Sequence, residues 1–122
     1  LAGHVTVQTG AILGGLVGIH QFCVIGTLSF IGGMSRVSMD VLPYMIMEGH
    51  PARCVGPNTV GLERNGLTKK AVARIRRMHR ILFRSGLNME QAVAAVLEQV
   101  ADSPERQTVL DFIRNSERGV SR

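Results

Sequence analysis

The first third of the sequence carries an aliphatic residue at every sixth position. Seven successive members of this series are Leu, Ile or Val: Leu1, Val7, Leu13, Ile19, Ile25, Ile31 and Val37. A spacing of six does not keep side chains on one face of an α-helix, and an ordinary β-strand repeats with a period of two. The period is typical of a β-helix, in which each hexad supplies a short strand, a corner and one inward-pointing aliphatic side chain.

A second series supports this interpretation. Small or β-branched residues stand four positions after the aliphatic ones, as at Ala11, Cys23 and Ser29, where they suit the narrow part of a coil. Glycines follow the aliphatic residue at Gly14, Gly26 and Gly32, and we expect them to relieve the backbone at the corners. Only two charged residues occur within 1–42, so we expect much of this segment to lie against another chain.

The chain opens inside the repeat, without a polar cap. Stacked coils bury their core by adding further coils, so an uncapped first coil is exposed. We therefore expect the chain to be the C-terminal part of a longer protein. The uncharged stretch 11–33 is long enough to span a bilayer, but its six glycines, His20 and Gln21 argue against insertion. No basic leader precedes an apolar run, so a signal peptide is not expected.

The amino-acid composition narrows the class of protein further. Hydrophobic residues make up 45% of the 122 residues and aromatic residues only 4%, which predicts an aliphatic core. Two cysteines without a CxxC pair predict neither a disulfide framework nor a zinc motif. The net charge of +5 favours an anionic partner.

Prolines and glycines interrupt the repeat after residue 42. They predict an irregular crossover over 43–66, and their positions are Pro43, Gly49, Pro51, Gly56, Pro57 and Gly61. Three helices are then expected within 67–122, in an antiparallel bundle. Their starts are marked by Thr68, by Asn88 with Gln91, and by Ser103 before Pro104, and Gly86 is expected to stop the first helix. The predicted apolar stripes are Ala71, Val72, Ile75, Met78 and Leu82; Ala92, Val93, Val96, Leu97 and Val100; and Val109, Leu110, Phe112 and Ile113.

The first of these helices is strongly basic. It holds half of the chain's Lys and Arg residues and no acidic residue: Lys69, Lys70, Arg74, Arg76, Arg77, Arg80 and Arg84. One interpretation is a solvated face of an amphipathic helix, and a second is a docking surface for an acidic protein or a phosphorylated ligand. Nucleic acid is not expected, because no aromatic residue stands between the charges to stack on bases.

Several segments in order resemble one enzyme family. They are "VGIHQFCVIG", "IGGMSRVSMDVLPYMIMEGHPAR" and "GPNTVGLERNGL", followed by helices that include "RSG". Together they resemble the acyl-acyl-carrier-protein–UDP-N-acetylglucosamine O-acyltransferases of lipid A biosynthesis, over the whole chain but only the C-terminal half of that family's usual length. The resemblance implies a β + α fold: a left-handed parallel β-helix with three hexads per coil, followed by the helical bundle. It also implies a homotrimer with active sites between subunits and a location in the bacterial cytoplasm.

The implied reaction moves a 3-hydroxyacyl chain from acyl carrier protein to the 3-hydroxyl of UDP-N-acetylglucosamine. It needs no cofactor or metal, but it needs a base for the hydroxyl proton and donors for the oxyanion. The family's base lies in a His-Asp-Cys stretch, which this sequence does not contain. We therefore expect the base upstream of Leu1 and assign no catalytic residue within the chain.

The resemblance assigns substrate-binding roles residue by residue. His4 matches a position lining the sugar and acyl site, His20 and Gln21 match contacts to the UDP-sugar, and Asn58 and Arg64 match nucleotide-binding positions. The alternative for each histidine is a hydrogen-bonded structural role, and for Arg64 a surface ion pair with Glu63 or Glu48. Asn65 departs from the second arginine that the family often carries.

Two further surfaces follow from the resemblance. Gly33 matches the position that bounds the acyl pocket, where glycine admits a longer chain unless Met34 fills the space; the alternative is a simple corner glycine. The basic helix, at Arg76, Arg77 and Arg80, is expected to dock the acidic acyl carrier protein.

Three other functions remain open from the sequence. A related N-acyltransferase acts later in the same pathway and shares the hexads, but it generally lacks this longer helical bundle. A zinc carbonic anhydrase shares the β-helix, and His4 and His20 are spaced so that they could approach each other, but the hexads hold no third histidine at matching spacing. A non-catalytic scaffold or remnant is the third.

Overall fold

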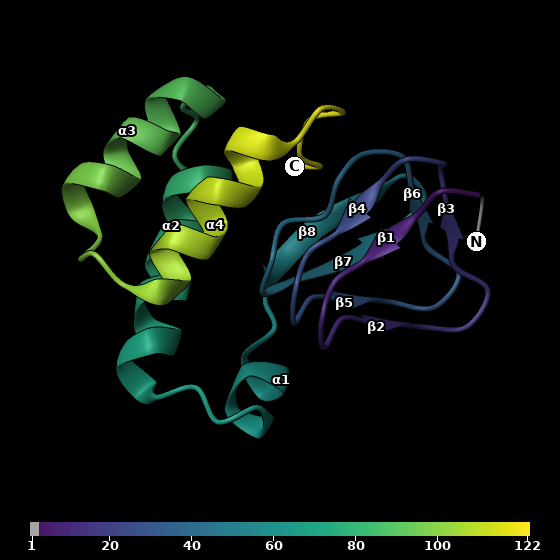
Figure 1. The fold of residues 1–122 in the computed structure, drawn as a ribbon, viewed down its shortest axis with the longest axis horizontal. Coiled ribbons are helices and arrows are strands. Elements are labelled where there is room, and N and C mark those ends of the chain that lie inside the picture. Colours follow the sequence, from purple (N-terminus) through teal and green to yellow (C-terminus); the bar gives the residue numbers. More distant parts are fainter. Residues whose placement is uncertain (1–2) are drawn as a thin grey trace.

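The computed structural model describes residues 3–122 as a β-helix with a helical subdomain beside it (Figure 1). Six two-residue strands form the coils: β1 Thr6–Val7, β2 Ile12–Leu13, β3 Gly18–Ile19, β4 Val24–Ile25, β5 Phe30–Ile31 and β6 Arg36–Val37. They pair in parallel as β1 with β4, β2 with β5 and β3 with β6. Thr6 lies opposite Val24, 18 residues further on, so each coil consists of three hexads.

The aliphatic series points into the column, as the sequence predicts. Ile19, Ile25 and Ile31 are between 0 and 4% exposed, and the small series fills the rest of the interior, with Cys23 and Ser29 fully buried. Val7 stacks on Ile25 of the following coil and is 41% exposed. Leu1 lies outside the described residues.

The corners are built differently from the prediction. The residues with left-handed backbone conformation also recur every six positions, and most are not glycine: His4, Gly10, Leu16, Phe22, Leu28 and Met34. The glycines predicted to relieve the corners have no left-handed φ. A Cβ added at Gly14 would lie 2.5 Å from the backbone nitrogen of Gly33, and one at Gly26 would lie 2.4 Å from that of Pro43. These glycines therefore permit close approach of the following coil.

The prediction of irregular structure over 43–66 is wrong. Strand β7, Met45–Gly49, extends the column by pairing in parallel with β5, which places Met47 on Ile31. Strand β8, Ala52–Pro57, folds back antiparallel on β7, and a short helix, α1 Thr59–Arg64, follows. Most of the prolines and glycines mark the turns and ends of these elements, which is why the segment reads as irregular in sequence.

The three predicted helices are confirmed. They are α2 Lys69–Arg84, α3 Met89–Gln99 and α4 Pro104–Asn115, and they run in alternating directions (Figure 1). Thr68 and Ser103 cap α2 and α4, and Asn88 forms a capping box with Gln91. The stripe of α2 is buried throughout, but Leu97 of α3 is 53% exposed, because α3 packs on α2 through Ala92 and Val96.

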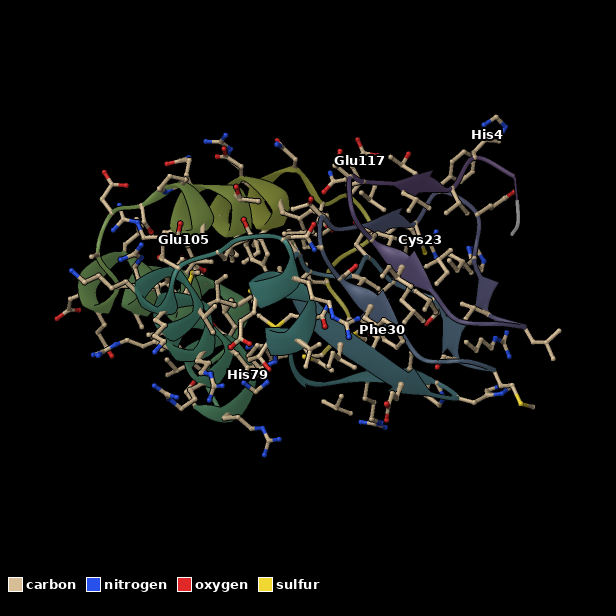
Figure 2. The ribbon with its side chains drawn as sticks, turned by 90° about the horizontal axis from the view of Figure 1, so that it is seen from below. His4, Cys23, Phe30, His79, Glu105 and Glu117 are labelled. Carbon is tan, nitrogen blue, oxygen red and sulfur yellow. The ribbon has the colours of Figure 1, made fainter. Side chains whose placement is uncertain are left out.

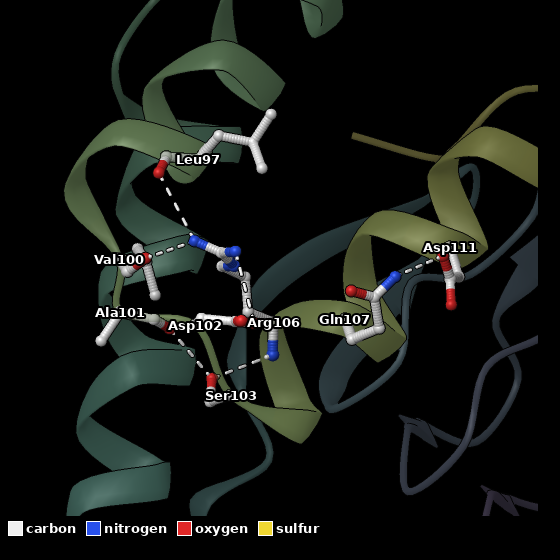
Figure 3. A network of polar contacts seen from close by, with 8 residues as sticks. All are labelled: Leu97, Val100, Ala101, Asp102, Ser103, Arg106, Gln107 and Asp111. Carbon is white, nitrogen blue, oxygen red and sulfur yellow. Dashed lines mark hydrogen bonds and ion pairs between the residues drawn. The ribbon is translucent and has the colours of Figure 1, made fainter.

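A single arginine closes the turn between α3 and α4 (Figure 3). The Arg106 guanidinium donates to the carbonyl oxygens of Val100 at 3.0 Å and Leu97 at 3.4 Å, which have no partner at the end of α3. It also forms an ion pair with Asp102 at 3.3 Å. These contacts satisfy carbonyl oxygens at the end of α3 and link that end to the first turn of α4.

The helices are attached to the β-helix by a shared core and by the returning chain. Leu42, Tyr44 and Met45 belong to the same apolar cluster as α2, α3 and α4. The buried Asp40 carboxylate accepts hydrogen bonds from the Val24 amide at 2.8 Å and the Ser116 hydroxyl at 2.5 Å. The helical bundle therefore packs directly against the β-helix, through apolar contacts and through the hydrogen bonds of Asp40. Within residues 3–122 no helix has both the length and the apolar character that crossing a bilayer requires.

The close approach at Gly26 yields a stability prediction. Gly26→Ala should lower the free energy of unfolding by about 1–3 kcal/mol, because the new methyl group overlaps Pro43 backbone atoms that cannot rotate away. Gly15→Ala is the matched control, since a Cβ there meets no atom within 4 Å. Denaturant titration of the full-length gene product measures both, and equal effects would contradict the stacking described here.

Candidate functional site

One corner of the β-helix gathers three of the residues expected to bind substrate. The His4 ring stacks on Phe22 of the next coil, with ring centroids 5.3 Å apart and planes inclined by 15°. His4 projects from the end of the column that is remote from the helices (Figure 2). His20 and Gln21 directly precede Phe22, so the structure brings His4, His20 and Gln21 to the same corner.

The orientation of His20 leaves one ring nitrogen free. Its Nδ1 lies 3.1 Å from the backbone oxygen of Gln21, and because a carbonyl oxygen only accepts, Nδ1 must donate. In the neutral ring the exposed Nε2 is therefore an acceptor. His20 is suited to receive a hydrogen bond from a substrate hydroxyl.

His20 also borders an open groove of about 400 Å³ that runs along the outer face of β3 and β6. Met34, on the opposite side of this face, lines the same groove and is 74% exposed. Gly33 beside it has room for a side chain, since an added Cβ would meet only Gly15 backbone atoms, at 3.4 Å or more. Of the predicted sugar-binding and acyl-binding residues, His20 and Met34 thus line opposite sides of one groove.

Asn58 lies away from this groove, and its side chain is already engaged. It is 8% exposed, its amide nitrogen donates to the Leu28 carbonyl oxygen at 3.0 Å, and its amide oxygen accepts from the Gly61 amide at 3.3 Å. These contacts cap α1 and fix it against a corner of the column. In this structure Asn58 positions α1.

Of the two residues at the end of α1, Arg64 is free to contact a ligand and Asn65 is engaged with the helix. Arg64 is exposed, and it takes part in none of the ion pairs found within 3–122, so a pairing with Glu63 or Glu48 is not seen. Asn65 donates to the Gly61 carbonyl oxygen at 2.7 Å. The Arg64 guanidinium offers donors suited to phosphate oxygens.

Few of the positive charges on the basic face of α2 are paired with acidic side chains. Arg74 binds the buried Glu105, with Nε and Oε1 2.6 Å apart. Arg76, Arg77 and Arg80 are exposed and join no ion pair in the described part of the chain. Among these three, Arg77 and Arg80 border a hollow against α3. The surface is cationic and presents its guanidinium groups to solvent.

The buried titratable groups do not form a second reactive centre. Burial, followed by the charges of Arg84 and Arg80, lowers the pKa of His79, whose Nε2 has no hydrogen-bond partner among the described residues. Burial raises the pKa of Cys54 to about 11, so its thiol is not ionised near neutrality. No group of three or more potential metal ligands from His, Cys, Asp and Glu occurs within 3–122.

Arg36 and His50 also line the groove, and the sequence interpretation did not single them out. A signal for Arg36 existed, because it is the only Lys or Arg within residues 1–42. His50 had no such signal, because it reaches the groove only through the β7–β8 hairpin that the sequence interpretation missed.

Comparison with known protein families shows to which family the chain belongs. A family model described as UDP-N-acetylglucosamine O-acyltransferase, domain 2, matches residues 40–121. The chain belongs to this family. Acyl-acyl-carrier-protein–UDP-N-acetylglucosamine O-acyltransferases that it matches include those of Anaeromyxobacter dehalogenans, 39% identical over 100% of the chain and 48% of the relative, and Myxococcus xanthus, 43% identical over 97% and 46%.

Solved structures of UDP-N-acetylglucosamine acyltransferases match the fold of this chain. The UDP-N-acetylglucosamine acyltransferase of Bacteroides fragilis matches with a TM-score of 0.97 and 39% identity, over 100% of this chain and 48% of that one. The Arabidopsis enzyme matches with a TM-score of 0.92 and 36% identity, over 100% and 46%. The expected fold class is confirmed: a left-handed parallel β-helix followed by a helical bundle. The chain spans about half the length of the curated relatives it matches.

The buried contacts of Asn58 predict a structural effect. Asn58→Ala should lower the free energy of unfolding by about 2 kcal/mol, because the Leu28 carbonyl and the Gly61 amide lose their partner. Asn65→Ala, which removes one exposed hydrogen bond, should change it by less than about 0.5 kcal/mol. Thermal and denaturant unfolding of the two variants measure the difference, and an unaffected Asn58→Ala protein would refute the positioning role.

Proposed function

We propose that the protein containing this chain transfers a 3-hydroxyacyl group from acyl carrier protein to the 3-hydroxyl of UDP-N-acetylglucosamine, the first step of lipid A biosynthesis. The observation that carries the proposal is the match to the acyltransferase family across the whole chain, with the same fold. The groove that joins His20 to Met34 supports it, because an acyl acceptor and an acyl chain must meet at one place. The proposal includes a cytoplasmic location in bacteria, which the resemblance implies.

The proposed chemistry is acyl transfer from a thioester to an alcohol. A base removes the proton from the sugar hydroxyl, whose oxygen attacks the thioester carbon, and the thiol of the carrier leaves. We assign the base to a residue outside this chain. Within it, His4, His20 and Gln21 hold the sugar nucleotide at the corner. Arg64, which lies on α1 at a different corner of the column, contacts its phosphates from a neighbouring copy of the protein. Asn58 contributes by holding α1, and thus Arg64, in place.

The exposed apolar residues of the column support a trimer. Large hydrophobic side chains are exposed on the outside of the coils, and they include Ile12, Leu16, Phe22 and Met34, each at least 55% exposed. Exposed apolar surface of this extent is characteristic of a protein interface. We propose that it packs against two further copies of the protein, and that Gly33 and Met34 bound the acyl chain beside that interface.

An assay of the full-length gene product tests the function. The protein should convert UDP-N-acetylglucosamine and a 3-hydroxyacyl carrier protein to an O-acylated UDP-sugar, detected by mass spectrometry. A parallel reaction with a UDP-3-O-acylglucosamine that carries a free amine tests the related N-acyltransferase. Transfer to the amine alone, or no transfer to either acceptor, would refute the proposal.

The basic face of α2 supports a specific donor-docking site. Arg76, Arg77 and Arg80 are exposed there, and reversal of all three to Glu should raise KM for the acyl carrier substrate at least tenfold, because it repels an acidic carrier. The KM for the UDP-sugar should stay within twofold. As a matched pair, Arg77→Glu should raise the carrier KM and Arg53→Glu on β8 should not. Steady-state kinetics at low and high salt measure these KM values. An unchanged KM for the acyl carrier substrate in the triple variant would refute the docking site.

A further inference from the structure

The outer face of β3 and β6 carries an ordered set of side chains. Ile19 and Val37 lie opposite each other and are buried in the column. Because side chains alternate along a strand, the residues on either side of them point outward: Gly18 and His20 in one coil, Arg36 and Ser38 in the next. Neighbouring coils are about 4.8 Å apart and alternate residues in a strand about 6.6 Å, so these four groups share one small surface.

Arg36 lies on this surface beside an open space. It pairs in register with Gly18, and a Cβ added at Gly18 would meet no atom within 4 Å. The groove along the face is lined by Arg36 together with Leu16, Gly18, His20, Met34 and His50 among others. A guanidinium group opposite a glycine has room to meet a ligand lying in the groove.

The charge of Arg36 is not neutralised by the protein. Within 3–122 it joins no ion pair, and no Asp or Glu lines the groove. The other charged residue of the coils, Asp40, is 2% exposed and binds Val24 and Ser116. The His50 imidazole and the Ser38 hydroxyl, which line the same groove, can add hydrogen-bond donors near the guanidinium.

We propose that Arg36, with Ser38 and His50 lining the same groove, binds a phosphate group of a substrate there. The inference rests on the proposed function, which supplies two substrates that carry phosphate: the diphosphate of the UDP-sugar and the phosphodiester of the carrier's phosphopantetheine arm. Arginine suits phosphate because its planar fork of donors matches the phosphate oxygens. The apolar side of the groove, where Leu16 and Met34 are 86% and 74% exposed, accepts the carbon chain beside that phosphate.

Arg36→Gln in the full-length gene product tests the proposal, with Arg36→Lys as the conservative variant and Arg53→Gln as the control. Arg36 and Arg53 are both exposed on strands, at β6 and β8, and neither joins an ion pair in the described part. Calorimetry measures binding of UDP-N-acetylglucosamine in one arm and 4′-phosphopantetheine in the other. We expect Arg36→Gln to weaken one of these ligands at least tenfold, Arg36→Lys to weaken it less, and Arg53→Gln to leave it unchanged.

The ligand that weakens identifies the source of the phosphate. Acyl transfer and ligand binding by Arg36→Gln at wild-type values would overturn this inference while leaving the proposed function intact. Equal losses in Arg36→Gln and Arg53→Gln would also overturn it, because the effect would then be one of net charge. Absence of both acyl transfer and binding in the unmodified protein would refute the proposed function, and this inference with it.

Discussion

The structure depends on the stacking of 18-residue coils in register. Each coil places Leu, Ile or Val side chains on those of the next. Backbone hydrogen bonds, such as that from the Gly18 amide to the Ser35 carbonyl oxygen at 2.9 Å, hold the spacing. The same register fixes the outer surface, because an inward Val37 forces Arg36 outward beside Gly18. The groove along this face is therefore a direct consequence of core packing.

The helical subdomain extends this framework. Its apolar face shares a core with Leu42 and Met45, and its returning chain hydrogen-bonds the buried Asp40. This arrangement fixes the basic face of α2 relative to the column. The proposed carrier-docking face and the groove thus belong to parts of the chain that share one core, as required if a tethered acyl donor is to reach an acceptor held at the coils.

Sequence alone predicted the parts of the fold whose signals are periodic or local. The hexads, the caps at Thr68, Asn88 and Ser103, and the buried stripe of α2 are all confirmed. The hairpin over 45–57 was missed, because its prolines and glycines read as breaks while its pairing with β5 is a tertiary contact. Corner glycines were misread for a similar reason: Gly26 is required by the approach of Pro43, which no local pattern reveals. In the site, family resemblance indicated His4, His20 and Met34, whereas the engaged side chain of Asn58 and the position of His50 depend on contacts between distant segments.

Native-state hydrogen exchange, followed by NMR on the full-length protein, tests the coil register most directly. The amides of Gly14, Gly18 and His20 donate to carbonyl oxygens of the next coil, at 2.8 to 2.9 Å, and should exchange slowly. The amides of Gln21 and Gly33, which have no such partner in the described structure, should exchange fast. Protection that recurs with a period of six would agree with the stacked column. Uniform protection across 14–33, as in a continuous α-helix, or none at all, would contradict it.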